Sequence, residues 1–458
     1  MKKETDKFTL MTSAPVERLV CRLAFPSIIT MLISSFYNMI DTYFVSFLGT
    51  SAIAGVGIVF PLMAVIQALG FLFGQGSGNY MSRELGAQNY DKAEKMAATG
   101  FFSALIFGAL LAVTALFFIE PLALALGATP TILPYAKEYM RFILIGMPWM
   151  AGSLVLNNQL RFQGSSLYGM VGILSGVILN VILTPIFIFV LELGIRGASM
   201  ATMICQAVSC SILLVGCSRK GNIGIRLSNF SPSLFNFREI VRGGFPSLVR
   251  QGLMSIMTIV INHFAVVYGD AAVAAISIVN RVCMFASAAV MGTGQGFQPV
   301  CGFNFGAKRF DRVKQAFWFC VKVVSAALTV ISVVLAIYAP QVISLFSADD
   351  WDVIRIGALS LRIQCIGLPF TGWVIMCNMM MQTTGHPLQA SFLALSRQGL
   401  FLMIFLLLLT PHLGLLGIQI SPAASNVASS IIAVPIGLIF LGKLKEYEKN
   451  AKKREGGY

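Results

Sequence analysis

The chain has 458 residues, of which 57% are hydrophobic and 11% charged, and its mean hydropathy is +0.80. Soluble globular proteins carry about 25% charged residues, so this composition excludes a soluble protein and indicates a polytopic membrane protein. The net charge of +14 does not indicate nucleic-acid binding, because Lys and Arg are concentrated in alternate loops between apolar runs.

Twelve apolar runs are long enough to cross a bilayer as helices. In chain order, the predicted spans are 20–46, 52–74, 94–118, 131–156, 168–190, 197–217, 240–267, 272–294, 315–338, 353–380, 388–410 and 417–442. No apolar segment with a small-residue cleavage site precedes the first span, so we expect no removable signal peptide. The basic residues of the N-terminus, the even-numbered loops and the tail predict that both termini are cytoplasmic, and they are expected to contact anionic membrane lipids.

The sequence repeats itself at an offset of 220 residues. Phe25-Pro26-Ser27 recurs as Phe245-Pro246-Ser247, and Gly74-Gln75-Gly76 recurs as Gly294-Gln295-Gly296. Each half contains an even number of spans, so the halves share one orientation. We therefore expect an all-α polytopic membrane protein with twelve transmembrane helices in two six-helix parallel repeats around a central cleft. The predicted parts are an N-lobe (1–218), a basic cytoplasmic linker (219–238) and a C-lobe (239–458).

Two prolines occupy equivalent positions in this repeat. Pro26 and Pro246 each lie inside the first span of their half. A proline within a helix removes a backbone donor and clashes with the preceding turn, which bends the helix. Membrane helices also tolerate prolines without functional consequence, but the equivalence of the two positions favours a bend in both spans.

Asp41 is the one acidic residue placed well inside an apolar run. A carboxylate within a bilayer costs about 2.5 to 3.5 kcal/mol even on the lenient insertion scale, so it normally faces a cavity or a partner. Burial raises the pKa of such a group and hydrogen-bond donors lower it, which predicts an acid that titrates during function. The alternative is a structural acid with permanent hydrogen bonds. Its repeat equivalent is Ile261, so the role belongs to the first half alone.

Other polar residues inside the spans of the first half are Asn157, Asn180, Thr184 and Thr202. Asn180 and Thr184 are one helical turn apart and share a face. Each residue alone is better explained by an interhelical hydrogen bond than by a site. The three histidines have no shared spacing, so neither a metal site nor a cofactor is expected.

The motifs together resemble the MATE (multidrug and toxic compound extrusion) transporters, with the closest likeness to the MepA-like bacterial branch. The likeness rests on Pro26, Asp41-Thr42, the segment 49–55, both Gly-Gln-Gly motifs and Asn180 followed by Thr184-Pro185, together with Leu85-Gly86-Ala87-Gln88 and Phe305-Gly306-Ala307-Lys308. It covers nearly the whole chain.

This resemblance implies a multi-pass protein of the bacterial plasma membrane that is not an enzyme. It implies a secondary active exporter of small amphiphilic or cationic substrates, working by rocker-switch alternation and coupled to inward H⁺ or Na⁺. The family's coupling-ion cluster around Asp41 falls here on Asn180, Thr184 and Thr202, with Asn157 nearby. We expect the substrate cleft to include Tyr37, Asn38, Gln251 and His263, and the protein to work as a monomer.

Two departures from the family pattern favour H⁺ over Na⁺ as the coupling ion. Many members have a second acid where Thr184 stands, and the Na⁺-type members have acids in the seventh and tenth spans that are missing here. A single carboxylate suits a proton at least as well as Na⁺, which takes several oxygen ligands.

Two alternatives remain open at this point. Arg250, Arg281 and Arg397 lie inside spans of the second half and favour a lipid-linked oligosaccharide flippase of the wider superfamily, or a role in fixing helix contacts. A membrane receptor that transports nothing is the second alternative. It is disfavoured because the chain has no sizeable soluble domain to relay a signal.

Overall fold

The computed structural model describes residues 2–347 and 350–455, and the side chains of residues 7–35, 43–49, 51–347 and 350–449. Every regular element in these residues is a helix. The helices are α1 (Lys2–Ser13), α2 (Val16–Ser46), α3 (Thr50–Gly86), α4 (Tyr90–Phe117), α5 (Ile119–Ala125), α6 (Leu133–Phe162), α7 (Ser166–Pro185), η1 (Ile186–Val190), α8 (Gly194–Cys217), η2 (Leu227–Asn229), α9 (Leu234–Val266), α10 (Asp270–Gly306), α11 (Phe310–Ile337), α12 (Ala339–Ser344), α13 (Trp351–Thr383), α14 (Pro387–Leu395), η3 (Ser396–Leu400), α15 (Phe401–Leu413) and α16 (Leu415–Glu455).

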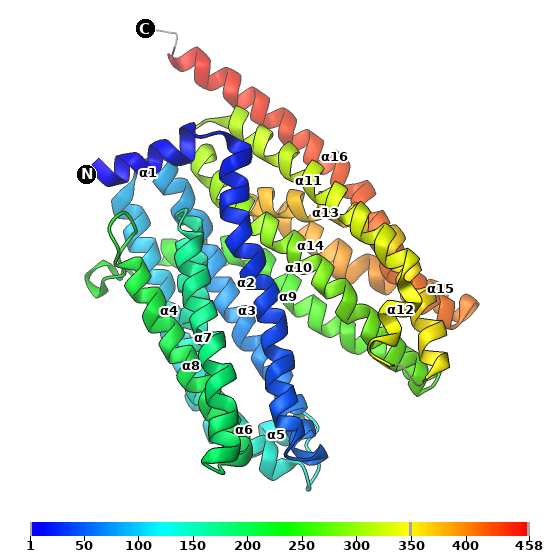
Figure 1. Cartoon of the computed structure of the whole chain (residues 1–458). Coiled ribbons are helices and arrows are strands. Elements are labelled where there is room, and N and C mark those ends of the chain that lie inside the picture. Colours follow the sequence, from blue (N-terminus) through cyan, green and yellow to red (C-terminus); the bar gives the residue numbers. More distant parts are fainter. Residues whose placement is uncertain (1, 348–349, 456–458) are drawn as a thin grey trace.

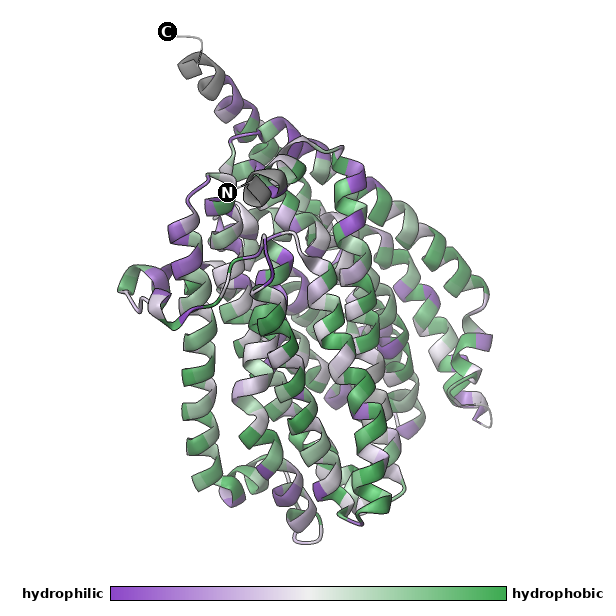
Figure 2. Ribbon diagram, turned by 60° about the vertical axis from the view of Figure 1, so that its left-hand side comes forward, coloured by the Kyte–Doolittle hydropathy of each residue, from purple (hydrophilic) through white to green (hydrophobic). Residues whose placement is uncertain are grey.

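Eleven helical segments of the described residues are long and apolar enough to cross a membrane. They match the second to twelfth predicted spans, and α2, with 31 residues, matches the first. The predicted fold class is confirmed. Large apolar side chains such as Phe117 (83% exposed), Ile259 (65%) and Val330 (63%) are exposed on the bundle, and Figure 2 shows that hydrophobic residues predominate along the long helices. Such exposure suits contact with lipid tails.

The internal repeat reappears in the backbone. Gly49 and Gly269, which precede α3 and α10, have φ angles of 103° and 94°. Gln88 and Lys308, which follow the same two helices, have φ angles of 61° and 59°, a left-handed conformation that non-glycine residues seldom adopt. Equivalent positions thus make the same unusual turns, although the residues at the second pair differ.

Helix packing follows the same repeat. α3 packs on α6 as α10 packs on α13, and α2 packs on α7 as α9 packs on α14. The halves meet where α3 runs along α9 and α10 runs along α2. In Figure 1 these four helices lie in the middle, with α4 to α8 on one side and α11 to α16 on the other. Both chain ends lie at the same end of the bundle, called here the terminal end.

The halves are in tight backbone contact at the terminal end, where α3 crosses α10. A Cβ atom added to Gly86 would lie 2.1 Å from the carbonyl oxygen of Phe303, and one added to Gly306 would lie 2.0 Å from that of Arg83. Gly86 and Gly306 are repeat equivalents, as are Arg83 and Phe303. The crossing is therefore reciprocal, and only residues without a Cβ allow this backbone approach.

Candidate functional site

Three of the polar residues predicted to form the coupling site lie together between α7 and α8. Asn180 of α7 donates a hydrogen bond from Nδ2 to Oγ1 of Thr202 of α8 over 3.2 Å. Thr184 follows one turn after Asn180, and all three side chains are at most 1% exposed. α2 packs against both of these helices. The cluster therefore lies on two helices that pack against the helix that carries Asp41.

Two oxygen atoms of this cluster have no hydrogen-bond partner among the described residues. They are Oδ1 of Asn180 and Oγ1 of Thr184, and both are buried. Leaving a buried polar atom unpaired costs about 1–3 kcal/mol. Directly after Thr184, Pro185 ends α7 and the π-helical turn η1 begins, a type of turn that is frequent at functional sites. Unpaired oxygens here are suited to accept a hydrogen bond from a protonated group or to bind a cation.

The other predicted members of the coupling and cleft sites lie elsewhere or are not described. Asn157 of α6 packs against Gly169, where an added Cβ would lie 2.9 Å from its Nδ2. Gly169 precedes Asn180 by three helical turns, roughly 16 Å along α7, so Asn157 is not part of the cluster. The side chains of Tyr37, Asn38 and Asp41 lie outside the described residues.

Gln251 lies where the two halves meet. Its Nε2 atom points toward Oε1 of Gln67 on α3 over 3.5 Å, the outer limit of a hydrogen bond. Our sequence reasoning missed Gln67, although an isolated glutamine in an apolar run could have indicated it. His263 is exposed on α9, whereas its neighbour Asn262 has a buried Oδ1 without a partner among the described residues.

Both predicted bend prolines are buried and lie within continuous helices. α2 runs through Pro26 and α9 runs through Pro246 without a break. The carbonyl of Pro26 accepts a hydrogen bond from Oγ1 of Thr30 over 2.8 Å. The bend itself stays a prediction.

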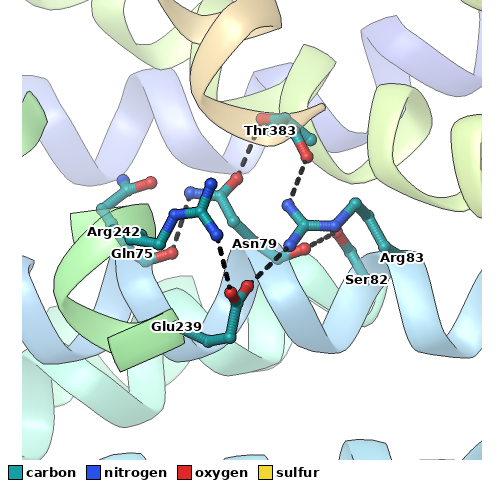
Figure 3. A network of polar contacts seen from close by, with 7 residues as sticks. All are labelled: Gln75, Asn79, Ser82, Arg83, Glu239, Arg242 and Thr383. Carbon is teal, nitrogen blue, oxygen red and sulfur yellow. Dashed lines mark hydrogen bonds and ion pairs between the residues drawn. The ribbon is translucent and has the colours of Figure 1, made fainter. Parts of the chain in front are cut away.

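A polar network closes the terminal end between the halves (Figure 3). Nη1 of Arg83 on α3 donates to the carbonyl of Thr383 on α13 over 2.8 Å, and Oγ1 of Thr383 donates to Oδ1 of Asn79 over 2.9 Å. Glu239 of α9 lies 3.7 Å from Nη2 of Arg83 and 3.3 Å from Nη1 of Arg242. Except for the pair Glu239–Arg242 within α9, these contacts join residues more than 150 positions apart, which is why no local sequence pattern predicted them.

A second connection between the halves is made by a buried arginine. Arg161 of α6 is 3% exposed. It donates to Oε1 of Gln295 on α10 and to Oδ1 of Asn158, each over 2.6 Å. Gln295 belongs to the second Gly-Gln-Gly motif. Both partners are neutral, so no carboxylate among the described residues balances the charge of Arg161.

Two further arginines of the second half also have only neutral partners among the described residues. Arg250 of α9 donates to Oδ1 of Asn378 over 3.2 Å and to Oγ of Ser247 over 3.4 Å. With its amide oriented to satisfy both neighbours, Gln398 donates to the backbone carbonyl of Arg250 and accepts from Arg397 over 3.1 Å.

The arginines differ in depth. Arg250 and Arg397 are half-buried, and Arg397 and Gln398 lie in the π-helical turn η3. Arg281, which we expected to be as deep, is exposed. The described residues contain no group of three or more His, Cys, Asp or Glu side chains able to hold a metal ion.

Comparisons with known proteins agree with this architecture. A family model described as MatE matches residues 26–186 and 246–408, one segment in each half. The multidrug export protein MepA of Staphylococcus haemolyticus is 30% identical over 417 residues, which are 89% of this chain and 90% of that protein. The outward-facing structure of a multidrug resistance MATE family transporter of the MOP superfamily is 27% identical, with a TM-score of 0.90 over 96% of this chain and 98% of that one.

A MOP superfamily transporter from Pyrococcus furiosus, described as having a binding pocket of reverse polarity, is also 27% identical. Its TM-score is 0.89, over 96% of this chain and 98% of that one. Both matched segments begin at the paired prolines Pro26 and Pro246. The chain therefore belongs to the MATE family, and so to a class of membrane transporters rather than to the enzymes.

Proposed function

We propose that the chain is a secondary active multidrug exporter that extrudes amphiphilic organic cations in exchange for inward H⁺ rather than Na⁺. Its similarity to MepA supports multidrug export. The observation that carries the coupling proposal is the pair of unpaired buried oxygens of Asn180 and Thr184 on α7. They lie on a helix that packs against α2, the helix with the one acid well inside a span.

Two lobes and a linker are part of the proposal. Residues 1–218 and 239–458 act as lobes joined by 219–238, and they rock about the contacts of α3 with α9 and of α10 with α2. We place the terminal end in the cytoplasm of a bacterial cell, so that both termini are cytoplasmic and the working unit is a monomer. The closed terminal end and the similarity to an outward-facing transporter support an outward-facing state.

Protonation of Asp41 couples the ion to the cargo. In its charged form the carboxylate favours cargo that enters from the cytoplasm. When a proton arrives from outside, the neutral acid gains an O–H group that can donate a hydrogen bond to the unpaired oxygen of Asn180 or Thr184. This new hydrogen bond rearranges α2 and releases the cargo. Coupling requires such a difference in affinity between the two states. Thr202 holds Asn180 in place by accepting its hydrogen bond. Asn157 lies outside the cluster and acts on the proton exchange at Asp41 from a distance.

The test is efflux of ethidium from proteoliposomes under separately imposed H⁺ and Na⁺ gradients. We expect the pH gradient alone to drive transport by the wild type. Asp41→Asn should abolish it, whereas Asp270→Asn, the same change at an exposed acid, should leave it intact. If Asp41→Asn couples normally, the proton-site proposal is refuted. Transport driven only by Na⁺ would refute the choice of ion.

A specific observation favours a second candidate, export of an anionic cargo such as a lipid-linked oligosaccharide. Arg161, Arg250 and Arg397 have no acidic partner among the described residues, and buried charges are normally paired. The similar transporter with a binding pocket of reverse polarity adds support. Arg250→Gln should leave ethidium efflux within about twofold if cations are the cargo. Loss of lipid-linked oligosaccharide flipping in the same variant would support the second candidate.

A further inference from the structure

A cavity of about 380 Å³ opens at the terminal end between α1, α2, the start of α7 and the loop after α8. Among the residues whose side chains are described, its lining includes three basic residues, Lys7, Arg22 and Lys220, and no acidic one. Leu19 and Leu23 of α2 form part of its apolar wall. A concave site that combines several cations with an apolar wall suits a ligand with one anionic group and a hydrophobic part.

Lys7 holds the floor of the cavity together. Its Nζ atom donates to Oγ of Ser165, to the carbonyl of Gly221 and to Oδ1 of Asn222, over 2.8, 3.1 and 2.8 Å. All three acceptors are neutral, so within the described side chains the positive charge is hydrogen-bonded but no carboxylate balances it. Burial lowers the pKa of Lys7 to about 8. An anion bound nearby would offset this cost of burial by stabilising the charged form of Lys7.

The other two cations are free to bind a ligand. Arg22 and Lys220 are exposed, and neither makes a side-chain hydrogen bond or an ion pair within the described part of the chain. They line the same cavity from different elements, one on α2 and one in the loop after α8. A single phosphate bound in the cavity would therefore gain from the charges of both, and from that of Lys7.

The surroundings identify the source of the anion. Leu10 (40% exposed), Leu167 (52%) and Tyr168 (46%) present apolar surface beside the cavity, at the ends of the helices that cross the membrane. Aromatic rings and basic side chains at this level are typical of contact with lipid headgroups. We propose that this cavity binds the phosphate headgroup of an anionic phospholipid, whose acyl chains run along the apolar flank of α2 and α7.

Such a lipid would act on both halves through α1. Nδ2 of Asn304 donates to the carbonyl of Met11, and Nη1 of Arg309 donates to that of Thr12, each over 3.1 Å. α1 therefore links the second half to the loops that Lys7 contacts in the first half. A headgroup that fixes α1 on the first half would hold the terminal end closed. This consequence for transport rests on the proposed function, whereas the binding site does not.

The experiment is native mass spectrometry of the full-length protein in detergent, titrated with phosphatidylglycerol or with zwitterionic phosphatidylcholine. We compare the wild type with Arg22→Gln/Lys220→Gln, which removes two cations without breaking a described contact. The matched control is Arg18→Gln/Arg219→Gln, because these exposed arginines do not line the cavity. A surface cation contributes about 1 kcal/mol to binding of anionic lipid, so the cavity variant should bind phosphatidylglycerol roughly 10- to 30-fold more weakly.

The control variant should stay within about threefold of the wild type, and phosphatidylcholine should not compete. Equal losses in the two double variants would overturn the site in favour of diffuse surface charge. Competition by millimolar inorganic phosphate or glycerol 3-phosphate as effective as by the lipid would overturn the lipid as the ligand. Neither result depends on transport, so failure here is distinct from failure of the exporter proposal.

Discussion

Gly86→Ala tests whether the terminal end must close for transport. The new Cβ would lie 2.1 Å from the carbonyl oxygen of Phe303, whereas non-bonded carbon and oxygen atoms need more than about 3 Å. The obstacle is helix backbone near the ends of α3 and α10, which cannot move aside like a side chain, so the halves must separate by about 1 Å. Overpacking of this kind costs about 1–3 kcal/mol. That amount shifts a two-state equilibrium by roughly 5- to 150-fold, here toward the state that is open at the terminal end.

The assay is hydrogen exchange of the peptides that end α3 and α10, together with ethidium efflux from proteoliposomes. We expect faster exchange at both helix ends and a comparable fall in the efflux rate. Gly57→Ala is the matched control, because it lies on the same helix and an added Cβ there meets no atom within 4 Å. If Gly86→Ala exchanges and transports like Gly57→Ala, tight closure at the crossing is not required and the reasoning fails.

Three further predictions concern the coupling site, the central arginine and the N-terminal helix. Thr184→Val should reduce H⁺-driven efflux at least tenfold without loss of thermal stability, while Thr410→Val, which also removes a buried unpaired hydroxyl, should leave efflux intact; equal effects would make Thr184 structural. Arg161→Ala should lower the free energy of unfolding by about 2 kcal/mol in denaturant titrations, because it leaves Oε1 of Gln295 unpaired in the interior and removes one of the two hydrogen bonds that Oδ1 of Asn158 accepts; a change under 1 kcal/mol would contradict this value. In lipid-free detergent, the thermal stability of the wild type should rise between pH 8 and 10 relative to that of Lys7→Met. The pKa of Lys7 is about 8 in the fold and 10.5 in the unfolded chain, so in this range the unfolded chain binds one proton more than the fold and each rise in pH favours folding. Parallel pH profiles of the two proteins would contradict the lowered pKa of Lys7.

Much of the fold could be predicted because its signals are local or repeated. The length of each apolar run indicates a span, and pairs such as Pro26 and Pro246 indicate a duplicated half. Helix ends were less predictable. α3 and α10 have 37 residues each, well beyond the predicted spans 52–74 and 272–294, because hydropathy marks the membrane-embedded part of a helix and not its continuation beyond the membrane.

The site was predictable where residues share one helix face, as with Asn180 and Thr184. It was not predictable where a partner comes from the other half. Nothing near Arg161 in the sequence indicates that Gln295 accepts its hydrogen bond, since that pairing depends on how two lobes dock. Asn157 shows the opposite case. It fits the pattern of a polar residue inside a span, yet it packs against Gly169 and lies away from the cluster of Asn180, Thr184 and Thr202.

The reciprocal crossing of α3 and α10 has a mechanical consequence. α3 has 37 residues and is therefore roughly 55 Å long, with the crossing at one tip. α3 is held by the other half over the terminal part of its length, where Gly76 and Gly244 also meet backbone across the interface, and a tilt of only ~10° there moves its far end by ~10 Å. The crossing can thus serve as a fulcrum that stays in contact while the opposite end of the transporter opens or narrows. This contact is lost only when the two halves separate at the terminal end. Opening the terminal end and opening the opposite end can therefore differ in free-energy cost.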